Sequence, residues 1–196
     1  MDVHTIPVKR TRGFSTVELV VSVAIILSVS AIAVPTITKT LNLYRVNDAA
    51  TQLAGILKIT RFEAIRRNTS INCLNAQAGP TAQATVWSDN NGNGVPDPGE
   101  KQIVLGVNAT LVAPAAVPNA GALATAAGVA ALTPVNPAGG SLKFDQRGAA
   151  NPPAVYVFYV GNVAANGFRA VIVLPSGSVQ IWTYTGNAAN LWQIVS

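Results

Sequence analysis

A long apolar segment near the N-terminus dominates the hydrophobic pattern. Residues 14–34 read FSTVELVVSVAIILSVSAIAV and carry a single charged side chain, that of Glu18. About 20 apolar residues in an α-helix suffice to cross the hydrocarbon core of a bilayer. The pattern therefore predicts a membrane-spanning helix over about residues 14–35. It ends at Pro35, a residue type that bends or locally opens a helix.

The pattern becomes amphipathic after the proline. Apolar residues recur there at steps of three and four: Leu43, Val46, Ala50, Leu53 and Leu57. A helix with this spacing has one apolar stripe, which suits packing on a sheet. Arg66 and Arg67 would lie in the last turn, where the negative end of the helix dipole favours cations. Asn68 is a residue type that often ends a helix. The two segments together predict one long helix over residues 14–68.

The rest of the chain alternates between short strands and turns. Strands are favoured where β-branched and aromatic residues alternate with polar ones, at residues 70–74, 84–88, 102–105, 141–144, 154–160, 168–174, 178–184 and 191–195. The Pro175-Ser176-Gly177 sequence predicts a hairpin turn. Residues 69–196 are thus expected to form a β-rich head, an antiparallel sheet on the long helix. The fold class is α+β.

One segment of the head lacks the usual core residues. Residues 108–140 contain no charged side chain and are dominated by Ala, Pro, Gly and Asn. Such a composition supplies few large side chains to a core. We expect a flexible or loosely packed insertion at about 107–140, with a partner-binding loop as the alternative.

Composition and charge narrow the functions. Hydrophobic residues make up 49% of the chain and charged residues 11%, whereas about 25% charged is typical of soluble domains. The net charge of +5 raises the question of a nucleic-acid partner. Beyond residue 68, however, basic and acidic side chains balance: Lys101, Lys143, Arg147 and Arg169 against Asp89, Asp97, Glu100 and Asp145. The head is neutral, and we do not expect it to bind nucleic acid.

Cysteine and histidine usage argues against catalysis. Cys73 is the only cysteine, so it cannot form an intrachain disulfide, and its neighbours offer no base or cation to activate a thiolate, which favours a place in the core. The only histidine, His4, precedes the apolar segment. If that leader is removed, nucleophile systems and metal sites that need histidine are excluded. We therefore do not expect the protein to be an enzyme.

The start of the chain admits two interpretations. Residues 9–13, KRTRG, precede the apolar run, which places the leader in the cytoplasm and sends the head outward. A secretory signal peptide would instead be cut after the apolar region, where residues 31–33 offer a loose cleavage site. That interpretation leaves Glu18 unexplained, because a carboxylate inside a span costs about 2.5–3.5 kcal/mol and indicates a functional site. The plain alternative is a carboxylate that reaches the membrane interface.

The arrangement Lys-Arg-Thr-Arg-Gly13, Phe14-Ser-Thr-Val-Glu18 and an apolar helix resembles the prepilin signature of type IV pilins and type II secretion pseudopilins. The resemblance implies that a prepilin peptidase cuts after Gly13 and methylates Phe14, so that leader 1–13 is lost and the apolar helix kept. It also implies that Glu18 pairs with the α-ammonium of a neighbouring subunit, since a buried charge is tolerable when paired. A proline is common in the family at the position of Pro35.

The helix end, Leu-Lys-Ile-Thr-Arg-Phe-Glu-Ala-Ile-Arg-Arg-Asn68, is similar to that of the GspH/FimT group of minor pseudopilins and pilins. WSDNNGNG at 87–94, FDQRG at 144–148 and RAVIVLPSG at 169–177 fit the same group. The resemblance implies a type IV pilin fold and a structural subunit of a type II secretion pseudopilus or a type IV pilus.

The resemblance also implies a location and partners. The chain would cross the bacterial inner membrane once, with its head in the periplasm, and then enter a filament. Its partners would be other pilin or pseudopilin subunits, the prepilin peptidase and the inner-membrane assembly platform. The alternative is a DNA-binding minor pilin for DNA uptake. Relatives of that kind are expected to carry arginines toward the C-terminal end, and residues 176–184 have none.

Residues 89–100, DNNGNGVPDPGE, match the pattern of a calcium-binding loop at every specified position. The ligands would be Asp89, Asn91, Asn93, the carbonyl of Val95, Asp97 and Glu100. The flanking segments resemble strands rather than the two helices of an EF-hand. The alternative is a turn whose Asn and Asp side chains bond their own backbone. Calcium is thus the only candidate cofactor.

Overall fold

One continuous helix forms the N-terminal part of the protein. In the computed structural model, which describes residues 13–162 and 167–195, α1 (Thr16–Arg67) is 52 residues long. It matches the predicted helix at 14–68 and runs through Pro35 without interruption, so the local opening expected there is not seen. The chain forms two compact units, Met1–Lys39 and Thr40–Ser196, and α1 contributes to both.

The end of α1 is fixed by backbone geometry. Asn68 adopts a left-handed conformation with φ of 50°. Its N–H donates to the carbonyl of Ile65 and the N–H of Thr69 donates to that of Ala64, each at 3.1 Å. This pair of hydrogen bonds is a Schellman motif, in which asparagine is tolerated better than most residues. The predicted stop at Asn68 is confirmed.

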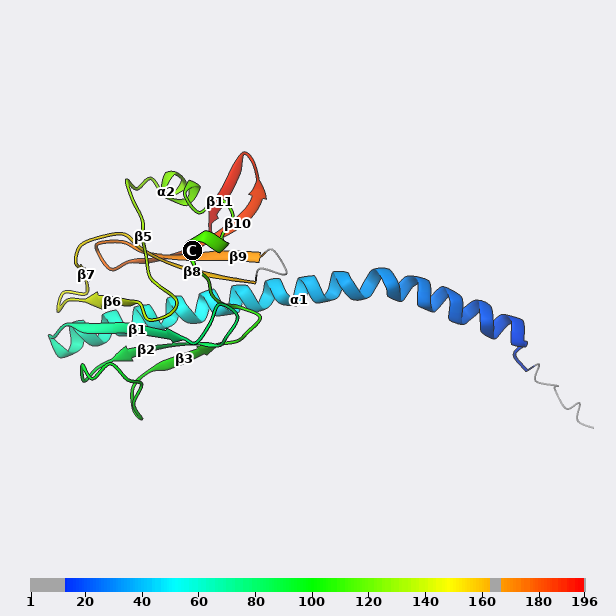
Figure 1. Ribbon diagram of the computed structural model, residues 1–196, viewed down its shortest axis with the longest axis horizontal. Helices are drawn as coiled ribbons and strands as arrows, with labels where there is room; N and C mark the ends of the chain where they lie inside the picture. The colour runs from blue at the N-terminus through cyan, green and yellow to red at the C-terminus, as the bar shows by residue number, and fades with distance from the viewer. Residues whose placement is uncertain (1–12, 163–166, 196) are drawn as a thin grey trace, which may run out of the picture. The chain divides into compact units, whose positions relative to one another are not determined.

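The head contains two antiparallel sheets rather than the single sheet predicted (Figure 1). The five-stranded sheet has the order β3-β2-β1-β6-β7. Its strands are β1 (Ile71–Gln77), β2 (Ala84–Asp89), β3 (Gln102–Leu105), β6 (Ser141–Phe144) and β7 (Ala150–Asn151).

The six-stranded sheet has five strands in the order β11-β10-β9-β8-β4, and its sixth strand, β5 (Thr133–Pro134), pairs in parallel with β8. The strands on this path are β4 (Thr110–Leu111), β8 (Tyr156–Asn162), β9 (Gly167–Val173), β10 (Val179–Asn187) and β11 (Asn190–Ile194). The strands expected from local pattern are all present. The division into two sheets depends on long-range pairing, which the pattern does not encode.

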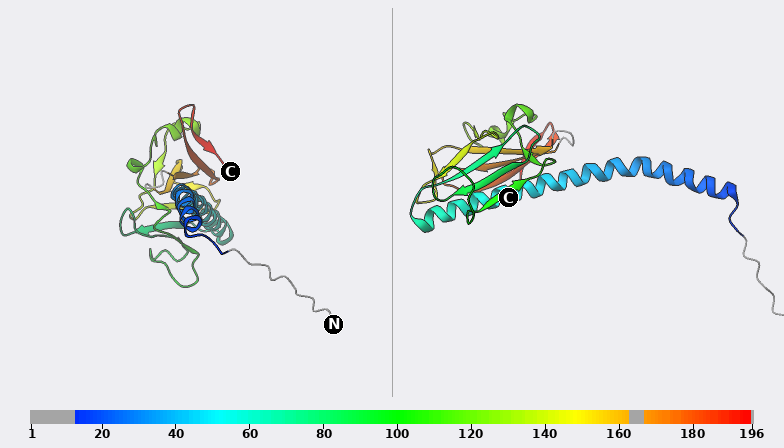
Figure 2. Two further views of the ribbon diagram at one scale, coloured as in Figure 1. Left: turned by 90° about the vertical axis from the view of Figure 1, so that its right-hand side faces the viewer. Right: turned by 60° about the horizontal axis from the view of Figure 1, so that its bottom comes forward.

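The C-terminal part of α1 lies along both sheets (Figure 2) and shares one core with them. Leu53 and Leu57 are completely buried, as are Phe144 of the first sheet and Val171 of the second. The predicted apolar stripe therefore faces the core, with only Leu43 half-buried at its start. Cys73 lies in this core, where burial raises the pKa of its thiol to about 12.

The segment predicted to be a loosely packed insertion is an ordered cover on the second sheet. It contains β4, a 3₁₀ turn at Pro114–Ala116, α2 (Ala122–Ala126) and β5. Val117 and Leu123 are buried against Trp182 and Trp192, and the indole N–H of Trp192 donates to the carbonyl of Asn119 at 3.2 Å. The expectation of loose packing is wrong, because the strands supply the large side chains that this segment lacks.

Two turns meet over the C-terminal part of α1. The guanidinium Nε of Arg61 donates to the carbonyl of Gly148 at 3.0 Å. Gly177, in the confirmed hairpin turn after β9, has φ of 79°, and a Cβ there would collide with that same carbonyl oxygen. The N–H of Ala150 also donates to the carbonyl of Pro175 at 3.0 Å. The FDQRG and PSG segments are thus two sides of one junction.

This junction makes Gly177 the most sensitive glycine for stability. Gly177→Ala should destabilise the head by at least about 2 kcal/mol, because alanine meets both a strained backbone conformation and a collision. Denaturant unfolding of the full chain in detergent, followed by tryptophan fluorescence, measures the change. Gly106→Ala is the control, since nothing lies within 4 Å of its Cβ position. Equal stabilities of the two variants would contradict the assignment.

Candidate functional site

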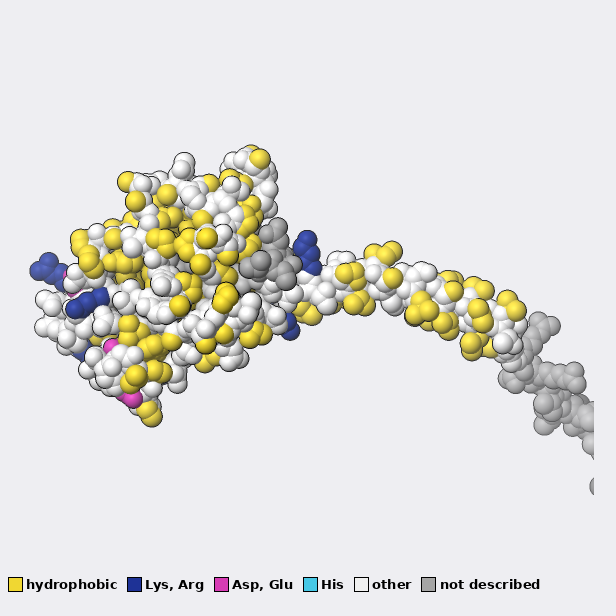
Figure 3. All heavy atoms as spheres, viewed as in Figure 1, with side chains coloured by type: hydrophobic (Ala, Val, Ile, Leu, Met, Phe, Trp, Pro, Cys, Tyr) yellow, Lys and Arg dark blue, Asp and Glu magenta, His cyan; other side chains and the backbone are white. Residues whose placement is uncertain are grey.

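The N-terminal part of α1 has an apolar surface with no cover within the described chain. Large apolar side chains from Phe14 to Ile37 are each at least 45% exposed, and they gather along this segment in Figure 3. The helix is long and apolar enough to cross a membrane by length and composition. Such a surface is far larger than the exposed apolar patches of soluble monomers, so lipid or another protein must cover it.

Glu18 lies in the first turn of α1, and its side chain is exposed. The free N–H groups and the dipole at a helix start favour a carboxylate there. Ser15 stands just before the helix, and the pair Ser15 and Glu18 has the spacing of a capping box. Sequence analysis did not use this Ser-x-x-Glu spacing.

The predicted processing residues lie just outside the helix. Gly13 and Phe14 precede α1 and are exposed, with Phe14 77% exposed. A peptide bond in this position is free of helical hydrogen bonding and reachable by a peptidase. Residues 1–12 of the predicted leader, which include His4, lie outside the described residues.

Three hydroxyl groups in this part of α1 are satisfied within the helix. Ser22 donates to the carbonyl of Glu18 at 2.7 Å, and Ser28 to that of Ala24 at 2.8 Å. Thr38 donates to the carbonyls of Val34 and Pro35. In hydrocarbon an unpaired polar group is costly, so these bonds fit a segment that lies in lipid.

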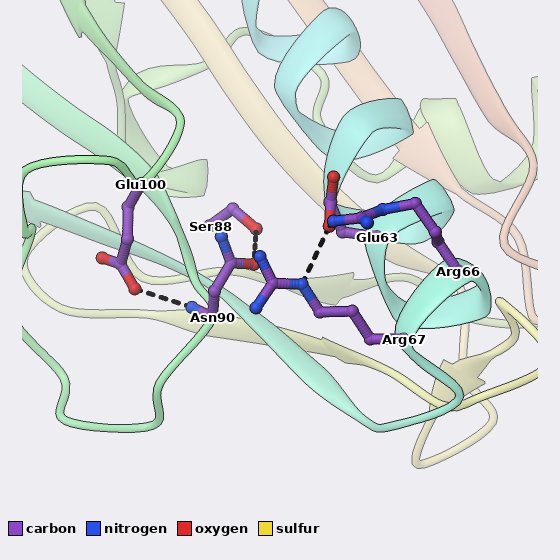
Figure 4. A network of polar contacts seen from close by, with 6 residues as sticks. All are labelled: Glu63, Arg66, Arg67, Ser88, Asn90 and Glu100. Atoms are coloured by element: carbon purple, nitrogen blue, oxygen red, sulfur yellow. Dashed lines mark hydrogen bonds and ion pairs between the residues drawn. The ribbon is translucent and has the colours of Figure 1, made fainter.

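The calcium-like loop is closed by its own side chains. Asp89 accepts hydrogen bonds from the N–H groups of Gly92 at 2.7 Å and Gly94 at 3.2 Å. Glu100 accepts from the N–H of Asn90 at 2.7 Å, as Figure 4 shows, and from the N–H of Asp97 at 3.2 Å. These bonds are those of the alternative interpretation, a turn held by side chain to backbone contacts.

The other candidate ligands take part in the same network. Asn91 and Asn93 turn their amide nitrogens toward the carboxylate of Asp97 and their oxygens toward backbone N–H groups. A cation would need those oxygens to turn inward, toward Asp97 and the carbonyl of Val95. Within residues 13–162 and 167–195, no group of three or more His, Cys, Asp or Glu side chains could hold a metal ion. Calcium binding therefore stays a prediction.

The cations at the end of α1 have an intrahelical partner. Arg66 and Arg67 both pair with Glu63, at 2.6 and 2.9 Å (Figure 4). Hydrogen bonds from Arg66 and Arg67 lower the pKa of Glu63, and Glu63 in turn raises the pKa of Arg66. Together with the favourable dipole position, this pairing accounts for the basic cluster without nucleic acid.

Arg169 makes structural contacts that sequence analysis did not identify. Its Nε donates to the Asn47 side chain at 2.6 Å and its Nη1 to the carbonyl of Phe168 at 2.7 Å. Burial lowers the pKa of Arg169. The side chain joins β9 to α1, a partnership across more than a hundred residues that no local motif predicts.

The chain matches one protein-family model, described as "Type II transport protein GspH", over residues 49–177. Two crystal structures of the type IV minor pilin FimU of Pseudomonas aeruginosa (strain PAO1) are similar, each at 17% sequence identity over 69% of this chain. They are covered over 90% and 87% of their length, with TM-scores of 0.46 and 0.43. No curated protein matches the chain.

Calcium titration separates the two interpretations of residues 89–100. If the loop binds the ion, calcium at 100 times its dissociation constant should stabilise the full chain in detergent by about 2.7 kcal/mol, seen as a higher melting temperature. Glu100→Gln should abolish that shift, and the neighbouring Lys101→Gln should keep it. An unchanged melting temperature at millimolar calcium would contradict calcium binding by this loop.

Proposed function

Because the chain belongs to the family of GspH type II transport proteins, we propose that it is a minor pseudopilin of a type II secretion pseudopilus. As a pilin-like member of that family it is a structural protein, not an enzyme. The family match covers most of the amphipathic part of α1 and most of the head. Assembly and processing are inferred from the N-terminal residues that precede the match.

The exposed apolar segment of α1 is the observation that carries the proposal. Its apolar side chains have no cover within the described chain and need a second environment. The segment fits the single inner-membrane anchor of pilins. In the membrane, lipid covers it; in the filament, the corresponding helices of neighbouring subunits replace lipid. The same apolar surface of α1 would thus contact lipid before assembly and neighbouring subunits after it.

Cleavage after Gly13 would give Glu18 a partner. The new α-ammonium on Phe14 would stand at the positive end of the helix dipole, where a cation is unfavourable. The carboxylate of Glu18 offsets this, either within the subunit or across to the next one. In an apolar filament core, an unpaired Glu18 would carry the full cost of a buried charge. Docking that matches each Glu18 with a neighbouring Phe14 removes this cost and sets the register.

Pro35 supplies a weak point in the helix. It has no backbone N–H, so one hydrogen bond of the helical ladder is missing there. We propose that the helix bends at this residue when subunits pack in a filament.

The structure does not favour DNA uptake as the function, since β10 (Val179–Asn187) carries no basic side chain and the basic cluster at the helix end pairs with Glu63.

Substitution of Glu18 tests the assembly role. Glu18→Ala and Glu18→Gln should be cut after Gly13 as efficiently as wild type, yet their incorporation into filaments should fall at least about tenfold, because no carboxylate remains to pair with the α-ammonium. Mass spectrometry of the N-terminal peptide measures processing, and immunoblots of sheared filaments measure incorporation.

Asp48→Ala is the matched control for these variants. It removes an exposed carboxylate from the same helix, one that bonds only Gln52 among the contacts described. It should assemble normally. Normal incorporation of both Glu18 variants into filaments would contradict the pairing mechanism. Loss of cleavage in these variants would indicate instead that the peptidase recognises Glu18.

A gene deletion decides which machine the subunit serves. We expect the deletion to abolish secretion of proteins into the culture supernatant and to leave surface pili intact. Complementation with the wild-type gene should restore secretion. Lost or shortened pili with normal secretion would instead make the protein a minor pilin.

A further inference from the structure

A groove of about 550 Å³ lies between α1 and the second sheet. Both elements contribute to its lining: Thr51, Gly55 and Lys58 come from the helix, and Arg169, Ile181 and Thr183 come from the sheet. Thr183 is the cross-strand partner of Arg169, so these two side chains lie on the same face of the sheet. Clefts that bind ligands have volumes of about 300–1,000 Å³, so this groove has room for an incoming side chain.

The charge of the groove is positive and is not neutralised within the described head. Among the described residues that line it, only Lys58 and Arg169 are charged. Neither forms an ion pair with any described residue. No acidic residue follows Asp145 in the sequence, so strands β8 to β11 have no side-chain carboxylate to offer. The groove is therefore complementary to an anion.

Arg169 is held so that part of its guanidinium group stays available. Nε and Nη1 donate to the side chain of Asn47 and the carbonyl of Phe168, which fixes the orientation of the group. Nη2 has no acceptor among the described residues. It is not one of their fully buried unpaired atoms, so a group in the groove can reach it. A half-buried guanidinium that is already oriented loses little entropy when it binds a carboxylate.

Apolar surface lies beside the two cations. Val195 lines the groove and is 62% exposed, and Ile181 is half-buried there. The N–H of Val195 donates to the carbonyl of Ile181 at 2.8 Å, so the two residues are neighbours across the strands. On the helix side, nothing lies within 4 Å of a Cβ at Gly55, so the groove is open there. Arginine beside apolar surface is typical of the centre of protein interfaces.

We propose that this groove binds an acidic side chain of a partner protein, with an apolar residue of the partner beside it. The carboxylate accepts a hydrogen bond from Nη2 of Arg169 and interacts with the ammonium group of Lys58. Such charge-assisted hydrogen bonds are about twice as strong as neutral ones. The apolar residue covers Val195 and Ile181, which a small free anion would leave exposed. The apolar surface therefore favours a polypeptide as the ligand.

Two capped tripeptides that differ in one charge test the site. The full processed chain in lipid nanodiscs is titrated with N-acetyl-leucyl-glutamyl-leucinamide and with the glutaminyl analogue. Nuclear magnetic resonance follows the Nε–H of Arg169 and the methyl groups of Val195. The glutamyl peptide should shift both signals and bind about tenfold more tightly than the glutaminyl peptide. Acetate, the free-anion probe, should bind more weakly than the glutamyl peptide because it covers no apolar surface.

Three variants locate the contact. Lys58→Gln and Arg169→Gln should each reduce the preference for the glutamyl peptide, whereas Arg45→Gln should keep it. Arg45 is the matched control because it is an exposed cation of α1 that lies outside the groove. Gly55→Leu should fill the groove and abolish binding of both peptides, and leucine is a better helix former than glycine.

Four results would each overturn the proposal. They are no binding by the wild type, equal binding of the two peptides, acetate binding as tight as that of the glutamyl peptide, and binding unaffected by Gly55→Leu. The last result remains decisive if Arg169→Gln fails to fold, since Arg169 also joins β9 to α1. The inference goes beyond the assembly role of the apolar part of α1. Its test measures peptide binding alone, so either proposal can fail without the other.

Discussion

The structure depends on burying one stripe of α1 against both sheets. Leu53 and Leu57 have no exposed surface, and their removal from water is worth about 1.5–3 kcal/mol per side chain. The helix must turn this stripe toward the sheets, which fixes its rotation about its axis. Its end is fixed separately, because the Schellman motif at Asn68 stops the helix and leads the chain into β1. The Arg61 contact to Gly148 then ties the helix to the first sheet, and the N–H of Ala150 joins that sheet to the hairpin of the second through the carbonyl of Pro175. A single helix thus organises sheets that do not share an edge.

The sequence of α1 changes character along its length. Beyond Lys39 the apolar residues form a stripe, and polar side chains such as Asn47 bond partners in the head. Before Lys39 apolar residues surround the helix, and the hydroxyls of Ser22 and Ser28 bond the helix backbone. Water would make this second segment unstable, whereas lipid or like helices would not. The proposed assembly function therefore rests on the composition along one element.

Local features of the fold could be predicted from the sequence, and long-range ones could not. The helix limits, the hairpin at Gly177 and the strand positions follow from periodicity and turn chemistry. The family match confirms the resemblance first suggested by a few motifs. The second sheet and the packing of Leu123 near Trp192 depend on pairing between distant segments. The Arg169 contact to Asn47 also gave no signal, because no local sequence pattern links residues so far apart.

The 89–100 loop shows where a motif stops being informative. A calcium loop and a side-chain-closed turn use the same residues, since both need Asp89 to accept backbone N–H groups and Gly94 to adopt positive φ. Those bonds already close the loop, so an ion would gain only the difference between coordination and the contacts that it displaces. Asn91 and Asn93 would have to give up Asp97. Any affinity for calcium would be set by this exchange, and a sequence pattern does not give its free energy.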